Sequence, residues 1–295
     1  MTTAGGRATA FTPAEPFRMV IEEGKVHEFA RATASACAGH LRSVDPVSPV
    51  TFLASHRLWT AERHSAWRGI ARDFRYLLHG EEEFIFHGPP PVAGTELTGR
   101  QVIERQYDKR GRRGGTMVFT DLVTRFWTAG GDEQHPLVEE RTVIISTEPP
   151  LSGATAPPTP ASAVARPPVS PSGPSTDDVV FDQALPALTV TDFVKYQGAS
   201  GDFNPIHHDT AFAQAAGRPG PFAVGMLSAA VAANLLADVV GVTNVRRYRV
   251  RWSDIAWPGD VLRHRGVRTA PGTYRVDVTR PDGRPNVTAW AQTTG

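Results

Sequence analysis

Cysteine is almost absent from this chain, which has 295 residues and a single cysteine, Cys37. One thiol cannot form an intramolecular disulfide, and it excludes a metal centre built from several thiolates. We interpret Cys37 as a small buried side chain. The fold must therefore be held together by packing.

Excess charge of either sign and long apolar runs are also lacking. The formal net charge of +1 argues against a dedicated nucleic-acid binder. The first residues have no apolar segment of the kind found in signal peptides. The most apolar stretch, Met226–Val240, is interrupted by Asn234 and Asp238. We predict a cytoplasmic protein that binds neither nucleic acid nor membrane.

An internal repeat indicates how the chain is organised. Three pairs of segments share a pattern and keep their order at nearly constant offset. They are Val26–Arg31 with Val190–Lys195, Val50–Leu53 with Val224–Leu227, and Gly94–Leu97 with Gly259–Leu262. An old duplication explains them. We predict two structural halves, 1–148 and 179–295, joined by a proline-rich linker over 149–178 that cannot build a core.

Within each half the pattern predicts a short helix, a loop, a longer helix and then strands. In the second half the helices are expected at Val190–Gln197 and Met226–Val240, and in the first half the same order repeats. The strands are expected at 83–86, 99–108, 116–126, 140–146, 248–252, 261–267, 273–279 and 287–293, with turn residues between them. The fold class is α+β, with antiparallel sheet wrapped around a helix.

A short turn after the helix at Val190–Gln197 combines a carboxylate with an imidazole. Asp202 and His207 flank an Asn-Pro step, which favours a chain reversal that lets both side chains converge. Such a pair can exchange protons at neutral pH. The competing interpretation is a structural turn capped by its own side chains. The pair suggests a lyase acting next to a carbonyl group.

The segments Ser200–His207 and Val224–Leu227 resemble the signature of MaoC-like (R)-specific enoyl-thioester hydratases and 3-hydroxyacyl-thioester dehydratases. The first half is similar to the FAS1-like dehydratase half of fused enzymes of this kind, at Glu23–Arg31, Pro46–Phe52 and His79–Phe84. The resemblance implies a double hotdog fold. It also implies that Asp202 and His207 are catalytic and that the Gly225 N–H binds the thioester carbonyl oxygen.

The first half lacks this equipment. Ala38, His40, Ser43 and Thr51 stand where the second half has Asp202, Asn204, His207 and Gly225. We therefore expect one active site per chain. The first half would supply a wall of the acyl pocket with apolar residues such as Phe52, although a plain core explains these residues equally well.

Three further features are candidates for substrate binding. Asn204 is expected mainly to fix the turn, and Val224 precedes the oxyanion donor. Arg247, Arg249 and Arg251 alternate along a predicted strand and so share one face. That face is either simply solvated or meets the phosphates of coenzyme A or an acidic acyl carrier protein.

The main functional hypothesis is reversible hydration of a trans-2-enoyl thioester. The (R) product is what the resemblance implies. One alternative is conjugate addition of an amine at the same site, and another is a non-catalytic subunit that binds acyl thioesters. The substrate carrier would be coenzyme A or acyl carrier protein, with no metal or redox cofactor. A monomer and a homodimer are both compatible with fused halves, and acyl length and reaction direction stay open.

Overall fold

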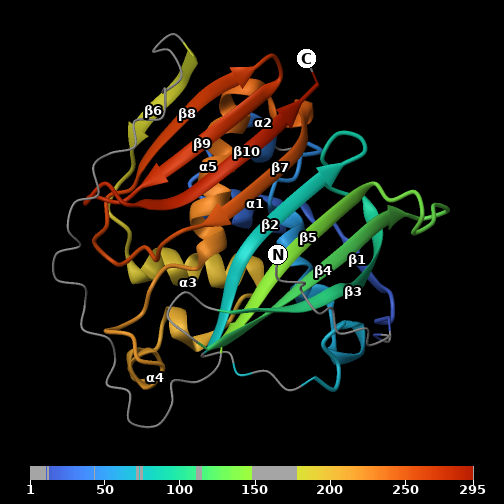
Figure 1. The fold of residues 1–295 in the computed structure, drawn as a ribbon. Helices are drawn as coiled ribbons and strands as arrows, with labels where there is room; N and C mark the ends of the chain where they lie inside the picture. Colours follow the sequence, from blue (N-terminus) through green and yellow to red (C-terminus); the bar gives the residue numbers. More distant parts are fainter. Residues whose placement is uncertain are drawn as a thin grey trace, which may run out of the picture.

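The computed structural model describes residues 11, 13–42, 44–70, 73, 76–110, 115–147 and 178–294. These residues form one antiparallel sheet with helices packed on one of its faces (Figure 1). The strands are β1 (Phe17–Val20), β2 (Leu77–Phe86), β3 (Glu96–Arg110), β4 (Thr116–Thr128), β5 (Val138–Thr147), β6 (Val179–Ala184), β7 (Val245–Trp252), β8 (Arg263–Ala270), β9 (Thr273–Thr279) and β10 (Pro285–Thr293).

The order of strands across the sheet repeats the duplication. It runs β1-β3-β4-β5-β2-β7-β10-β9-β8-β6, so the second half repeats the first about the central β2–β7 pair. In that pair Glu82 lies opposite Val250 and Phe84 opposite Tyr248. The two halves thus share one continuous sheet, as the double hotdog prediction requires.

The α-helices are α1 (Glu23–Ala32), α2 (Ala38–Leu41), α3 (Val190–Ser200), α4 (Thr210–Ala215) and α5 (Gly225–Val240). Helix α5 packs on β7, β9 and β10, and α1 packs against α3. In Figure 1 α5 and α1 lie behind the strands, with α3 below the strands of the second half, so one sheet face is covered. Alanine and leucine make up half of α5, which gives it both high helix propensity and an apolar surface. Its Asn234 side chain donates to the Thr33 carbonyl oxygen at 3.1 Å and ties the halves together.

The first half departs from the expected long helix. Its counterpart is a short 3₁₀ helix, η1 (Phe52–Trp59), followed by another 3₁₀ turn, η2 (Glu62–His64). The Ser55 hydroxyl donates to the Phe52 carbonyl oxygen at 2.6 Å. A serine bonded in this way competes with the helical ladder and favours the tighter turn. The prediction of equivalent long helices was therefore wrong, and less helix covers this part of the sheet.

Two edge strands, β1 and β6, were not predicted either. β1 alternates between buried and exposed residues but is only four residues long, and β6 is exposed along its second half, so neither gives a strong signal in the sequence. The linker expected at 149–178 lies, apart from Asp178, outside the described residues. Cys37 is only partly buried, and burial raises the pKa of its thiol. No helix among the described residues is long and apolar enough to cross a membrane.

Candidate active site

The turn between α3 and α4 holds the predicted acid/base pair in a fixed shape. Helix α3 ends at Gly201, whose φ of 75° is left-handed and suits glycine. The Asn204 side chain then caps the 3₁₀ turn η5 (Pro205–His207) by accepting from the Ile206 N–H at 3.2 Å. Asn204 therefore fixes the turn, as expected.

Gln197 on α3 holds this turn in place through hydrogen bonds, a role that the sequence did not indicate. Its side-chain N–H groups donate to the carbonyl oxygens of Asp202 at 2.8 Å and Asn204 at 3.0 Å. Its Oε1 lies 2.8 Å from Nδ1 of His208, the exposed residue that follows the pair. One buried amide thus holds both ends of the loop that carries Asp202 and His207.

His207 has one ring nitrogen engaged and one free for chemistry. Its Nδ1 lies 2.9 Å from the Phe222 carbonyl oxygen, which can only accept, so Nδ1 carries the proton. Burial lowers the pKa of His207 below the usual value, although the Asp202 charge opposes this. The neutral form, with a lone pair on Nε2, therefore predominates near pH 7.

The Asp202 carboxylate faces both its own turn and the other half of the chain. Its Oδ1 accepts from the Asn204 N–H at 3.4 Å, and its Oδ2 lies 3.6 Å from a guanidinium nitrogen of Arg57 on η1. Sequence reasoning missed Arg57, because nothing in the pattern around it relates residue 57 to residue 202. The first half thus contacts the predicted catalytic carboxylate directly.

Gly225 opens α5, and the Trp252 indole lies against it. A Cβ added at Gly225 would lie 2.9 Å from Trp252 Nε1, so only glycine fits without displacement. No hydrogen bond among the described residues uses the Gly225 N–H, and Trp252 Nε1 also has no partner there. The Gly225 N–H lies at the positive end of the helix dipole, and the buried indole N–H of Trp252 is its neighbour. Trp252 had been assigned only to a strand.

One cleft collects these groups. Asp202, His207 and Gly225 line it together with Asn204 and Val224, and Arg57 and Trp252 line it as well. The structure therefore places the whole predicted acid/base and oxyanion set along one cleft. Among the described residues, no group of three or more His, Cys, Asp or Glu is arranged to hold a metal ion.

The corresponding region of the first half carries no such set. His40 is fully buried, with Nδ1 2.9 Å from the Val47 carbonyl oxygen, as His207 is bonded in the second half. Ala38 and Thr51 offer no acid beside it, and Ser43 lies outside the described residues. The prediction that Phe52 lines the acyl pocket was wrong. Phe52 packs edge-on to Phe29 in the main core and is not among the cleft residues.

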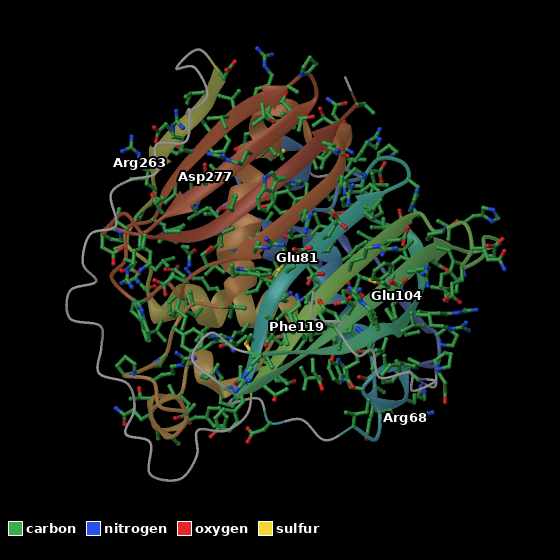
Figure 2. All side chains as sticks on the ribbon, viewed as in Figure 1. Arg68, Glu81, Glu104, Phe119, Arg263 and Asp277 are labelled. Atoms are coloured by element: carbon green, nitrogen blue, oxygen red, sulfur yellow. The ribbon has the colours of Figure 1, made fainter. Side chains whose placement is uncertain are left out.

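The three arginines of β7 lie on the sheet face opposite the helices, in ion pairs with β2. Arg247 binds Glu83 at 2.7 Å, while Arg249 and Arg251 both bind Glu81 at 2.8 Å. Figure 2 shows Glu81 on the face turned towards the reader, away from the helices. Arg249 and Arg251 lie along the cleft, but each guanidinium already has a carboxylate partner. Their first role is to join the two halves.

The single ten-stranded sheet is that of a double hotdog protein, and dehydratase family models match both halves of the chain. Residues 175–283 match the MaoC-like domain, and residues 9–133 match the FAS1-like dehydratase region. The chain therefore joins a FAS1-like dehydratase region to a MaoC-like dehydratase domain.

Two curated relatives come from Mycobacterium tuberculosis. The chain is 27% identical over 215 residues to 3-hydroxyacyl-thioester dehydratase Y, covering 70% of this chain and 68% of that one. It is 35% identical over 98 residues to enoyl-CoA hydratase ChsH3, covering 30% of this chain and 34% of that one. Among solved structures, a MaoC-like dehydratase from Phytophthora capsici is similar with a TM-score of 0.72 at 19% identity, over 96% of each chain. A Mycobacterium tuberculosis protein described as a double hotdog gives 0.62 at 11% identity, again over 96% of each.

Proposed function

We propose that this protein catalyses the reversible hydration of a trans-2-enoyl thioester to an (R)-3-hydroxyacyl thioester. The observation that carries the proposal is the convergence of Asp202, His207 and the Gly225 N–H on one cleft. The names of the two curated relatives, one a 3-hydroxyacyl-thioester dehydratase and one an enoyl-CoA hydratase, support this substrate class. The (R) configuration rests on the resemblance to MaoC-like enzymes.

In the proposed mechanism the thioester carbonyl oxygen accepts a hydrogen bond from the Gly225 N–H. We assign the Trp252 Nε1–H, which lies beside Gly225, as a second donor. When water adds to C3, negative charge builds on this oxygen, and one preorganised donor contributes ~3–4 kcal/mol of barrier reduction. The helix dipole adds to the same effect.

Asp202 and His207 would share the proton transfers. Asp202 accepts a hydrogen bond from the attacking water and orients it, while the neutral His207 removes one of its protons at Nε2. The water oxygen then bonds to C3, and the resulting imidazolium returns its proton to C2. One molecule of water is thereby added across the double bond, and dehydration follows the same steps in reverse.

The test is direct. The purified protein is incubated with short and long trans-2-enoyl-CoA, with and without an amine, and both the enoyl absorbance and the product mass are followed. A gain of one water supports hydration, and chiral analysis of the product decides (R) against (S). A gain of the amine would instead favour conjugate addition. His135→Gln, at an exposed site outside the cleft, is the matched control for substitutions of Asp202 and His207.

The free His207 Nε2 beside a carboxylate argues against the third hypothesis, a subunit that only binds thioesters. Such a subunit needs neither group. Absence of turnover with every enoyl-CoA and every enoyl thioester on acyl carrier protein, for protein shown to be folded, would refute the catalytic proposal.

A further inference from the structure

A cluster of buried polar side chains lies in the cleft wall that the first half contributes. We call it the polar cluster and define it as His56, His79, Glu82, Glu140 and Thr142. All of these except Glu82 line the cleft. Glu82 and Glu140 are 1% and 3% exposed, which is unusual for acidic side chains. A wall that only enclosed a saturated hydrocarbon chain would not contain such residues.

Part of the polar cluster is satisfied internally. Glu82 binds His79 Nε2 through one carboxyl oxygen at 2.6 Å and accepts from the Thr142 hydroxyl through the other at 3.0 Å. In contrast, Glu140 Oε2 and His56 Nδ1 have no hydrogen-bond partner among the described residues. His56 Nε2 lies 3.5 Å from Glu140 Oε2, outside good hydrogen-bond distance. A buried polar atom without a partner costs about 1–3 kcal/mol.

The polar cluster carries little charge at neutral pH. Burial raises the pKa of Glu82 to about 8, and burial together with Glu82 raises that of Glu140 well above the usual range. Burial also lowers the pKa of His56 to about 3 and that of His79 to about 4, with Arg57 adding to both effects. Two carboxylic acids and two neutral imidazoles can donate and accept hydrogen bonds, but they do not attract an ion.

The polar cluster begins beside the reacting groups. His56 precedes Arg57, which contacts Asp202, and the His79 ring centroid lies 4.2 Å from that of Trp252, the neighbour of Gly225. Along β5 the inward-facing residues are Glu140, Thr142 and then Ile144, because alternate residues share a face.

Beyond the polar cluster the wall becomes apolar. Ile144 packs against a small group that includes Trp67 and Leu122, and all three line the same cleft. An acyl chain that extends from the reacting carbons therefore meets polar atoms first and an apolar wall afterwards.

From these positions we infer that the acyl chain of the substrate carries a hydroxyl group, which hydrogen-bonds to Glu140 and His56. The inference rests on the hydratase function proposed above and specifies its substrate class. The hydroxyl would donate to one of the two side chains and accept from the other, so that both unpaired atoms gain a partner. The apolar end of the cleft would take the remainder of the chain.

The experiment compares trans-2-enoyl-CoA substrates of equal length with wild-type protein. One is unsubstituted, a series carries one hydroxyl at successive carbons beyond C4, and one carries an ionised carboxylate. We expect kcat/KM for the best hydroxylated substrate to exceed that of the unsubstituted one by roughly tenfold to a hundredfold. The carboxylated substrate should be the poorest, since the polar cluster itself carries little charge and the neighbouring Arg57 already faces Asp202.

Variants at Glu140 test whether this residue sets the preference. Glu140→Leu should bring the ratio of hydroxylated to unsubstituted kcat/KM close to one, whereas Glu140→Gln, which still donates and accepts, should keep part of it. The matched control is Glu139→Leu, because Glu139 is the neighbouring residue on β5 and does not line the cleft. Its ratio should equal that of the wild type.

The outcomes separate the two proposals. Hydration of the unsubstituted substrate with no preference for any hydroxylated one overturns the inference and leaves the proposed function standing. A preference for the carboxylated substrate also overturns it. No turnover of any thioester refutes the proposed function itself. If Glu140→Leu fails to fold, the ratio of hydroxylated to unsubstituted kcat/KM measured with the wild-type protein still tests the inference.

Discussion

Replacing Gly225 with alanine tests the oxyanion assignment. The added Cβ would lie 2.9 Å from Nε1 of Trp252, closer than real Cβ atoms approach another heavy atom, and 3.2 Å from Cδ1, which is also a tight contact. The indole cannot easily move away, because His79 packs on it and is itself held by Glu82 at 2.6 Å. The start of α5 must therefore shift, and with it the Gly225 N–H.

The magnitudes favour a loss of activity over a loss of stability. Alanine is about 1 kcal/mol better than glycine inside a helix, and this offsets part of a packing strain of about 1–3 kcal/mol. A displaced oxyanion donor costs ~3–4 kcal/mol of transition-state stabilisation. We thus expect kcat to fall roughly 100-fold to 1000-fold, while the free energy of unfolding changes by no more than about 2 kcal/mol.

The assay measures kcat with an accepted enoyl thioester and the unfolding midpoint in parallel. Gly24→Ala is a matched control, since Gly24 lies in the first turn of α1 and a Cβ there meets nothing within 4 Å. That variant should keep full activity and be as stable as the wild type or slightly more stable. A Gly225→Ala protein that retains kcat within about threefold would refute the reasoning.

Four other predictions follow from the same structure. Asp202→Asn and His207→Gln should each lower kcat roughly 100-fold to 10,000-fold with a nearly unchanged melting temperature. The double variant should have a kcat only slightly below that of the poorer single variant. Additive losses would show that the two residues do not act as a unit. Trp252→Phe, which removes the second N–H donor, should lower kcat by about tenfold or more, and equal turnover would exclude Trp252 from the oxyanion site. Buried His264 has a pKa lowered to about 4, so its contribution to stability is complete above pH 6.5 and is lost as the pH falls from there towards 4. His264→Leu should therefore flatten the stability profile in that window by up to about 1.4 kcal/mol per pH unit, and an identical slope in denaturant titrations would contradict this. Arg249→Glu should destabilise the protein by about 1 kcal/mol or less, and Glu81→Arg in the same chain should restore the lost stability. The contrary result is a KM that rises for enoyl-CoA but not for an enoyl pantetheine thioester and that stays raised in the double variant. That result would assign Arg249 to binding of the substrate carrier.

Much of the fold could be read from local patterns. The strand at Thr273–Thr279 has the expected bounds, and the long helix starts one residue before the expected Met226, because alternation and alanine content act over a few neighbouring residues. The first half was harder. A long helix was expected in this half, and a local serine bond together with its surroundings favours the 3₁₀ helix Phe52–Trp59 instead.

The turn that carries the proposed catalytic pair could be predicted because its parts are close in sequence. Asp202 and His207 are separated by only Phe203, Asn204, Pro205 and Ile206, so the backbone preferences of one loop decide their proximity. The duplication was readable for the same reason, since each half repeats a local pattern.

Only the tertiary structure decided what surrounds that turn. Arg57, His79, Glu140 and Trp252 come from four separate elements, and only the joining of the two sheets brings them to one cleft. Their sequence positions give no sign of this, because burial and pairing across a sheet depend on which strands become neighbours. The sequence by itself thus determined the proposed reacting groups, while the packing of the two halves determined the shape and polarity of the cleft around them.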